Sequence, residues 1–65
     1  MIVAVHAVWY SPDRRYRIEL FDQRGRQRLR VIDRSMPVAE LENVAALERW
    51  LAANCDFGFG DLIED

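Results

Sequence analysis

The side chains most suited to acid–base or nucleophilic chemistry are His6, Cys55 and Ser11. On antiparallel strands, His6 is predicted to align with Glu19 and Arg30 in one cross-strand row, which could poise an imidazole near neutral pH. We favour a structural hydrogen-bonded row, because no nucleophile is placed beside the histidine. Cys55 follows a predicted helix C-terminus, where the helix dipole does not favour a thiolate, and Ser11 lies in a turn without an identifiable base. The sequence therefore predicts no catalytic residue and a protein that is not an enzyme.

The sequence also gives little support for a metal site, a cofactor site or a disulfide. The chain has one cysteine and one histidine, whereas a zinc site needs about four ligands and a disulfide needs two thiols. The segment Phe57-Gly58-Phe59-Gly60 is not preceded by a strand or followed by a long helix, so it does not fit a dinucleotide loop. We interpret it as a turn that holds two aromatics against the core. The alternative is a partner-docking tail anchored by four apolar residues: Phe57, Phe59, Leu62 and Ile63.

The use of arginine is the most distinctive property of this composition. All nine basic residues are arginine and the formal net charge is −2. Eight of them fall in residues 1–34 with four carboxylates, giving +4, whereas residues 35–65 hold one arginine and seven carboxylates, giving −6. Arginine favours bidentate pairing and stacking. Together with Tyr10 and Phe21, an arginine set could contact nucleic acid; its members are Arg15, Arg17, Arg28, Arg30 and Arg34.

The elements that position these residues are predicted from alternation and turn signals. Apolar alternation indicates strands over residues 2–10, 15–22 and 27–34, and helical spacing indicates a helix over 44–54 that is capped by Asn43. Residues 36–41 are either extended, as a possible short fourth strand or as a connection, which we favour, or the start of a longer helix at Pro37. The tail at residues 60–64 is expected to form a last helical turn that returns Leu62 and Ile63 to the core. The expected fold is a single α+β domain over residues 1–65, a three-stranded antiparallel meander with the helix on one face.

Strand register divides the sheet into two faces. Pairing Leu20 with Leu29 and Ile18 with Val31 keeps apolar residues together, and a slip of one residue would reverse the faces. On the first strand we expect Val5 opposite Leu20, Ala7 opposite Ile18 and Trp9 opposite Tyr16. The helix-facing core is then predicted to contain Val3, Val5, Ala7, Trp9, Tyr16, Ile18, Leu20, Leu29 and Val31, covered by Val44, Leu47, Trp50 and Leu51.

The opposite face is too apolar for an ordinary solvated surface. It includes Ile2, Ala4 and His6, and its candidate interface residues are Val8, Tyr10, Arg17, Phe21, Arg28, Arg30 and Ile32. A chain of 65 residues has a small core, so burial of this face by a second copy would help to stabilise it. We therefore expect a non-enzymatic regulatory or adaptor protein that acts through protein–protein interaction, as a homodimer. A nucleic-acid-associated regulator that uses the arginine face is the alternative.

Two further expectations concern relatives and location. Three strands followed by a helix in so short a chain is similar to the arrangement of the small MbtH-like helper proteins. The tryptophan-proline signature of that family is absent from this sequence, so no residue role is transferred. No signal peptide or membrane-spanning segment is predicted, because the apolar run at residues 2–10 is too short and lacks basic flanks. The expected location is the cytoplasm.

Overall fold

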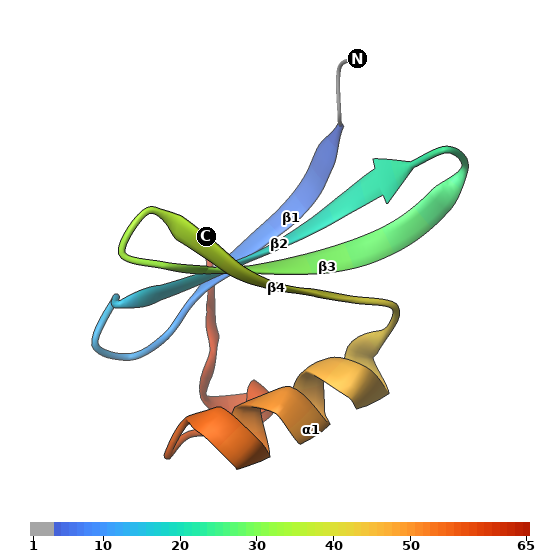
Figure 1. Ribbon diagram of the computed structural model, residues 1–65. Helices are drawn as coiled ribbons and strands as arrows, with labels where there is room; N and C mark the ends of the chain where they lie inside the picture. Colours follow the sequence, from blue (N-terminus) through green and yellow to red (C-terminus); the bar gives the residue numbers. More distant parts are fainter. Residues whose placement is uncertain (1–3) are drawn as a thin grey trace.

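The computed structural model describes residues 4–65, which form an antiparallel sheet with one helix across one of its faces (Figure 1). The α+β class is confirmed, but the sheet has five strands in the order β4-β3-β2-β1-β5, more than the predicted three-stranded meander with its possible fourth strand. The elements are β1 (Val5–Tyr10), β2 (Tyr16–Gln23), β3 (Arg26–Asp33), β4 (Met36–Leu41), α1 (Val44–Asn54), a 3-10 turn η1 (Phe59–Asp61) and β5 (Ile63–Glu64).

The central hairpin, β2 with β3, has the predicted register. Leu20 lies opposite Leu29 and Ile18 opposite Val31, because this alignment alone keeps the apolar side chains on one face. The turn consists of Arg24 and Gly25, with φ values of 52° and 77°, as a tight type I′ hairpin requires.

The pairing of β1 with β2 differs from the prediction. Trp9 lies opposite Ile18 and Ala7 opposite Leu20, a shift of two residues that leaves both on the helix side. A bulge then interrupts the register between Val5 and Ala7, so Val5 lies opposite Phe21. Because a bulge adds one residue to a strand, it changes the face on which the next side chain lies. Val5 is consequently 47% exposed and is not a core residue. The expectations for residues 2 and 3 lie outside the described part of the chain.

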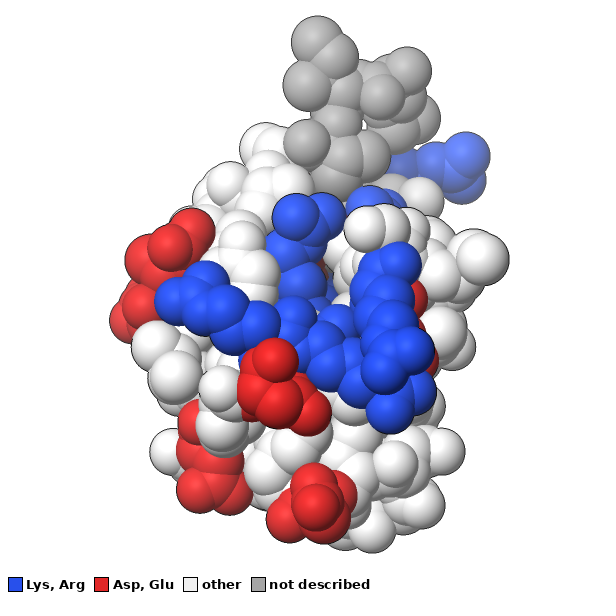
Figure 2. All heavy atoms as spheres, turned by 90° about the vertical axis from the view of Figure 1, so that its left-hand side faces the viewer, with Lys and Arg blue, Asp and Glu red and all other residues white. Residues whose placement is uncertain are grey.

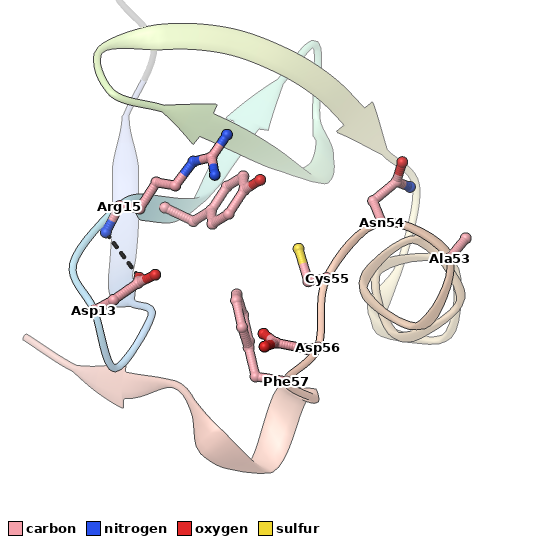
Figure 3. Close-up of a pocket in the computed structure, with 8 residues that line it drawn as sticks. Asp13, Arg15, Ala53, Asn54, Cys55, Asp56 and Phe57 are labelled. Atoms are coloured by element: carbon pink, nitrogen blue, oxygen red, sulfur yellow. Dashed lines mark hydrogen bonds between the residues drawn. The ribbon is translucent and has the colours of Figure 1, made fainter.

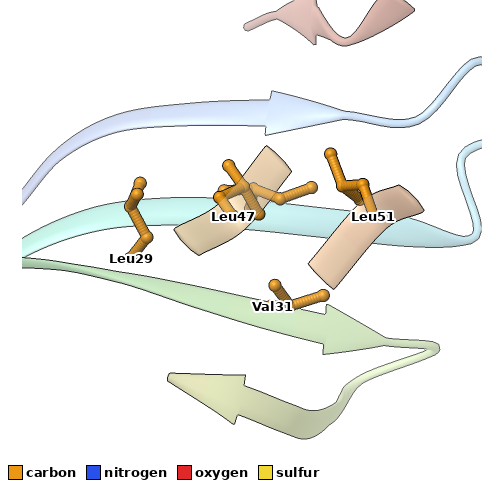
Figure 4. Packing of buried hydrophobic residues seen from close by; sticks show 5 residues of the cluster. Leu29, Val31, Leu47 and Leu51 are labelled. Atoms are coloured by element: carbon orange, nitrogen blue, oxygen red, sulfur yellow. The ribbon is translucent and has the colours of Figure 1, made fainter. Parts of the chain in front are cut away.

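The core lies between the sheet and α1. Leu47 and Leu51 from the helix pack against Ile18, Leu29 and Val31 from the central hairpin, and all five are buried (Figure 4). Their spacing of four residues places both leucines on one side of the helix.

The helix has the predicted bounds and the predicted cap. The Asn43 side chain accepts a hydrogen bond from the Ala46 amide at 2.8 Å, which satisfies an amide that has no partner within the helix. Val44 departs from the prediction: it is exposed and is not among the residues packed against the core.

Two short strands, β4 and β5, form the edges of the sheet. β4 confirms the extended alternative for residues 36–41, and its Pro37 is tolerated because β4 is an edge strand. The tail makes a 3-10 turn and then the short strand β5, which pairs with Trp9 and Tyr10. Leu62 packs against the core as expected, whereas Ile63 is exposed on β5. Phe57 and Phe59 also pack against the core.

Candidate interaction surface

The face of the sheet opposite α1 carries most of the predicted interface residues. We call it the arginine face and define it by Val8, Tyr10, Arg17, Glu19, Phe21, Arg28, Arg30, Ile32 and Glu40, which the observed register places together. Its rows run across the strands, so that Val8, Glu19, Arg30 and Glu40 form one row. Neighbours in such a row lie close enough to interact.

The apolar anchors expected on this face are buried within the chain. Phe21 is 1% exposed and Ile32 is 7% exposed. The Arg30 guanidinium lies over the Phe21 ring, 4.5 Å from its centroid, so a charged side chain covers the aromatic one with its flat face. The prediction that Phe21 and Ile32 offer exposed apolar area to a partner is therefore wrong for this structure. What the face presents to solvent is mainly arginine.

Carboxylates fix the three central arginines of the face. Glu19 lies between two of them, 3.1 Å from Arg17 and 3.6 Å from Arg30, and Glu40 lies 3.5 Å from Arg28. The Arg28 Nε–H is nevertheless buried without an acceptor, because 3.5 Å to Glu40 is a charge contact and not a well-formed hydrogen bond. These arginine side chains are 30–45% exposed. They form an ordered, half-exposed layer whose charge is partly neutralised.

The predicted row of His6, Glu19 and Arg30 does not form. Glu19 and Arg30 are paired, but Val8 takes the place expected for the histidine. Because of the bulge in β1, the His6 Nε2 instead lies 2.6 Å from an Asp22 carboxylate oxygen on the exposed surface. This pair lies at the end of β1 remote from Ser11 and from Cys55, so the structure does not assemble a histidine with a nucleophile.

Ser11 has a structural role in the turn between β1 and β2. Its side chain is fully buried, donates a hydrogen bond to Asp13 at 2.6 Å and accepts one from the Tyr16 amide at 3.0 Å. The Ser11 hydroxyl and the Arg15 amide hold the pKa of Asp13 below its ordinary value. A hydroxyl enclosed in this way cannot reach a substrate.

Cys55 lies in a hollow near the C-terminal end of α1 (Figure 3). Asp13 and Arg15 lie on one side of this hollow, with Asp56 and Phe57 on the other. Burial raises the pKa of the Cys55 thiol, which disfavours the thiolate that nucleophilic chemistry requires. The hollow therefore lacks an activated nucleophile.

Within residues 4–65, the arginines of the sheet that make no ion pair lie in or beside its turns. Arg15 forms a two-point pair with Asp33, at 2.9 and 3.0 Å, which lowers the Asp33 pKa. Within residues 4–65, Arg14 and Arg34 make no ion pair with a carboxylate. Both adopt positive φ, 62° and 50°, in turns at the same end of the sheet. Figure 2 shows arginine side chains gathered on that end, with carboxylates interspersed.

The predicted nucleic-acid contacts are thus of two kinds. Arg15, Arg17, Arg28 and Arg30 each lie beside a carboxylate, and only Arg34 does not. Arg14 was not predicted as a contact, although the sequence indicates a turn with charged residues beside it. The sequence did not reveal that Arg14 adopts a positive φ, which is uncommon for a residue other than glycine.

Comparison with known proteins adds no family. No protein-family model, curated protein or solved structure matches this chain. Within residues 4–65 no three His, Cys, Asp or Glu side chains are grouped so that they could hold a metal ion. Over the same residues, no helix has the length and apolar character needed to cross a membrane.

Proposed function

We propose that this protein is a non-enzymatic interaction module that binds an acidic protein surface through its arginine face. The observation that carries the proposal is the ordered layer of Arg17, Arg28 and Arg30, held by Glu19 and Glu40 and left half-exposed. Arginine is enriched in protein interfaces, and prior ordering of its side chain reduces the entropy lost on binding. A regulatory or adaptor role follows from binding without chemistry.

The first partner that we propose is a second copy of the chain. Residues 35–65 carry seven carboxylates and one arginine, and several of these acids lie on exposed positions of α1 and the tail, among them Glu48, Asp61 and Glu64. Two arginine faces stacked on each other would place like charges together, and the burial of Phe21 and Ile32 removes most of the apolar gain of that arrangement. A head-to-tail contact, in which the arginine face of one copy meets the acidic helix side of the next, brings opposite charges together and can be repeated along a row of copies.

The test is sedimentation velocity at micromolar concentration on the wild type and on two variants of equal charge. The double variant Arg17→Gln/Arg30→Gln removes two charges from the layer, and Arg24→Gln/Arg34→Gln removes two from the hairpin turns. We expect self-association whose dissociation constant rises about tenfold or more in the first variant, and much less in the second. Added salt should weaken the self-association of the wild type.

A monomer at all micromolar concentrations would refute self-association, and equal effects of the two variants would refute the role of the layer. Glutamine is used because it retains a stem over Phe21. Aspartate at Phe21 or Ile32 would place a charge in a buried site and unfold the chain, so it cannot report on assembly.

Nucleic acid is the competing partner, and a gel-shift series with single- and double-stranded DNA and RNA at rising salt separates the two. Tight binding that falls steeply with salt would replace the protein partner by nucleic acid. We favour protein because Glu19 and Glu40 lie among the central arginines, where a continuous phosphate backbone would meet negative charge.

A further inference from the structure

A recess of about 270 Å³ opens where the β1–β2 turn meets the β3–β4 turn. Four arginines line it: Arg14, Arg15, Arg17 and Arg34, with Tyr10 beside them. Arg14 and Arg34 lie in the two turns, and Arg17 lies near the start of β2. A hydrogen bond from the Arg34 amide to the Arg15 carbonyl, at 3.1 Å, joins the two turn regions. The recess is therefore built by residues far apart in sequence that the backbone holds together.

The charge of the recess is close to +2. Arg15 is paired with Asp33, and Arg17 lies 3.1 Å from Glu19. Arg14 and Arg34 have no carboxylate partner among residues 4–65. Two compensated and two uncompensated arginines on one small volume leave a strong field for a doubly charged anion.

Backbone hydrogen bonds hold the turn positions of both uncompensated arginines, and an aromatic contact orients the Arg14 side chain. The Arg14 guanidinium lies over the Tyr10 ring, 5.0 Å from its centroid, and the Arg14 amide donates to the Ser11 carbonyl at 2.9 Å. The left-handed backbone at Arg14 and Arg34 is a conformation that glycine or asparagine adopts more readily than arginine. Long cationic side chains thus occupy positions where local conformational preference favours smaller residues.

We propose that this recess binds the phosphate group of a small phosphate monoester. A phosphate monoester carries about two negative charges at neutral pH, which matches the two free guanidiniums, and arginine binds its oxygens through paired N–H donors. Tyr10 and Ser35 line the same space. The volume suits a phosphate with a small organic group and lies below that of most drug-sized sites. This proposal uses Arg14 and Arg34, which lie outside the arginine layer proposed for self-association, so either can fail alone.

The experiment is a titration of the ¹⁵N-labelled chain, in phosphate-free buffer, with phenyl phosphate and with phenyl sulfate. The two probes have similar shapes, but the sulfate ester carries a single negative charge. We expect phenyl phosphate to shift amide signals of residues 10–17 and 32–35, with about tenfold higher affinity than phenyl sulfate. The arm with inorganic phosphate tells whether the organic group contributes.

Protonation of the probe gives a second readout. The phosphate monoester gains a proton near pH 6, so its affinity should fall between about pH 7.5 and about pH 5 while that of phenyl sulfate stays constant. The charged residues that line the recess are the four arginines; Asp33 and Glu19 are paired with two of them, and Asp13 lies outside its lining, in the β1–β2 turn. Asp13 and Asp33 have lowered pKa values, so they remain ionised over this range.

Two matched variants complete the test. Arg34→Asn removes one free charge at a turn position with φ of 50°, and Arg24→Asn removes the same charge at the equivalent position of the other hairpin, with φ of 52°. Asparagine tolerates this conformation, so both variants should fold. We expect Arg34→Asn to lower phenyl phosphate affinity about tenfold and Arg24→Asn to leave it unchanged. Equal losses in both variants, or shifts spread over the whole sheet, would overturn the site.

Discussion

Replacement of Phe21 by alanine tests whether the arginine face has a core of its own. The ring is 1% exposed, and truncation of a buried phenylalanine costs about 3–5 kcal/mol. The flexible arginine stems above it can partly fill the space, so we expect about 3 kcal/mol for Phe21→Ala. About 0.5–1 kcal/mol of that is the lost contact with Arg30.

This loss is large for so short a chain. Domains gain about 0.05–0.15 kcal/mol of stability per residue, which for 65 residues corresponds to about 3–10 kcal/mol. Phe21→Ala should therefore lose between about a third and all of its stability at 25 °C, whereas Phe21→Leu, which keeps most of the apolar volume, should lose about 1 kcal/mol. Val5→Ala is the control, since Val5 lies opposite Phe21 but is 47% exposed; we expect a change within about 0.5 kcal/mol.

The assay is urea unfolding followed by the fluorescence of Trp9 and Trp50, at two protein concentrations. Equal midpoints at both concentrations would mean that the free energy belongs to the single chain, and unequal midpoints that assembly contributes to it. A loss below about 1 kcal/mol for Phe21→Ala would refute the buried placement of Phe21. The arginine face would then be the exposed interface that alternation alone predicts.

Two further predictions concern titratable groups. The Arg15 guanidinium lowers the pKa of Asp33, so the pair stabilises the fold above the ordinary aspartate pKa of about 3.9, and this contribution is lost as pH falls through the lower folded value. The urea midpoint of the wild type should therefore drop on acidification below about pH 4. The variant Asp33→Asn should be less stable than the wild type at pH 7, and its stability should be less sensitive to acid. A midpoint in Asp33→Asn that follows acid as the wild type does would contradict this. Burial raises the pKa of the Cys55 thiol, so iodoacetamide at neutral pH should alkylate it more slowly than in urea. Equal rates in both conditions would show an accessible thiol.

The sequence was most informative where local patterns are strong. The register of β2 with β3 follows from alternation, because a single slip would place Arg28 and Arg30 among Ile18 and Leu20. The bounds of α1 follow in the same way from the Asn43 cap and the spacing of its leucines. In both cases, residues that are close in sequence determine the local structure.

The sequence was least informative where the cause is tertiary. Nothing near His6 marks a bulge, yet this bulge moves Val5 to the arginine face and separates His6 from Glu19. A two-residue strand such as β5 has no alternation of its own, and it forms because β1 offers it an open edge. Phe21 and Ile32 were assigned the correct face, but their burial depends on side chains of neighbouring strands that cover them.

The charge division visible in the sequence also has a different meaning in three dimensions. The +4 of residues 1–34 indicated a basic sheet, but Glu19 and Glu40 partly neutralise the centre of the arginine face and Asp33 pairs with Arg15. Arg14 and Arg34, which lie in turns and make no ion pair within residues 4–65, converge on one recess. A continuous basic track favours an extended polyanion. In this chain, the partly neutralised centre of the arginine face favours a protein surface instead, and the charged recess at the end of the sheet favours a small anion. The two proposals therefore follow from the same distribution of carboxylates.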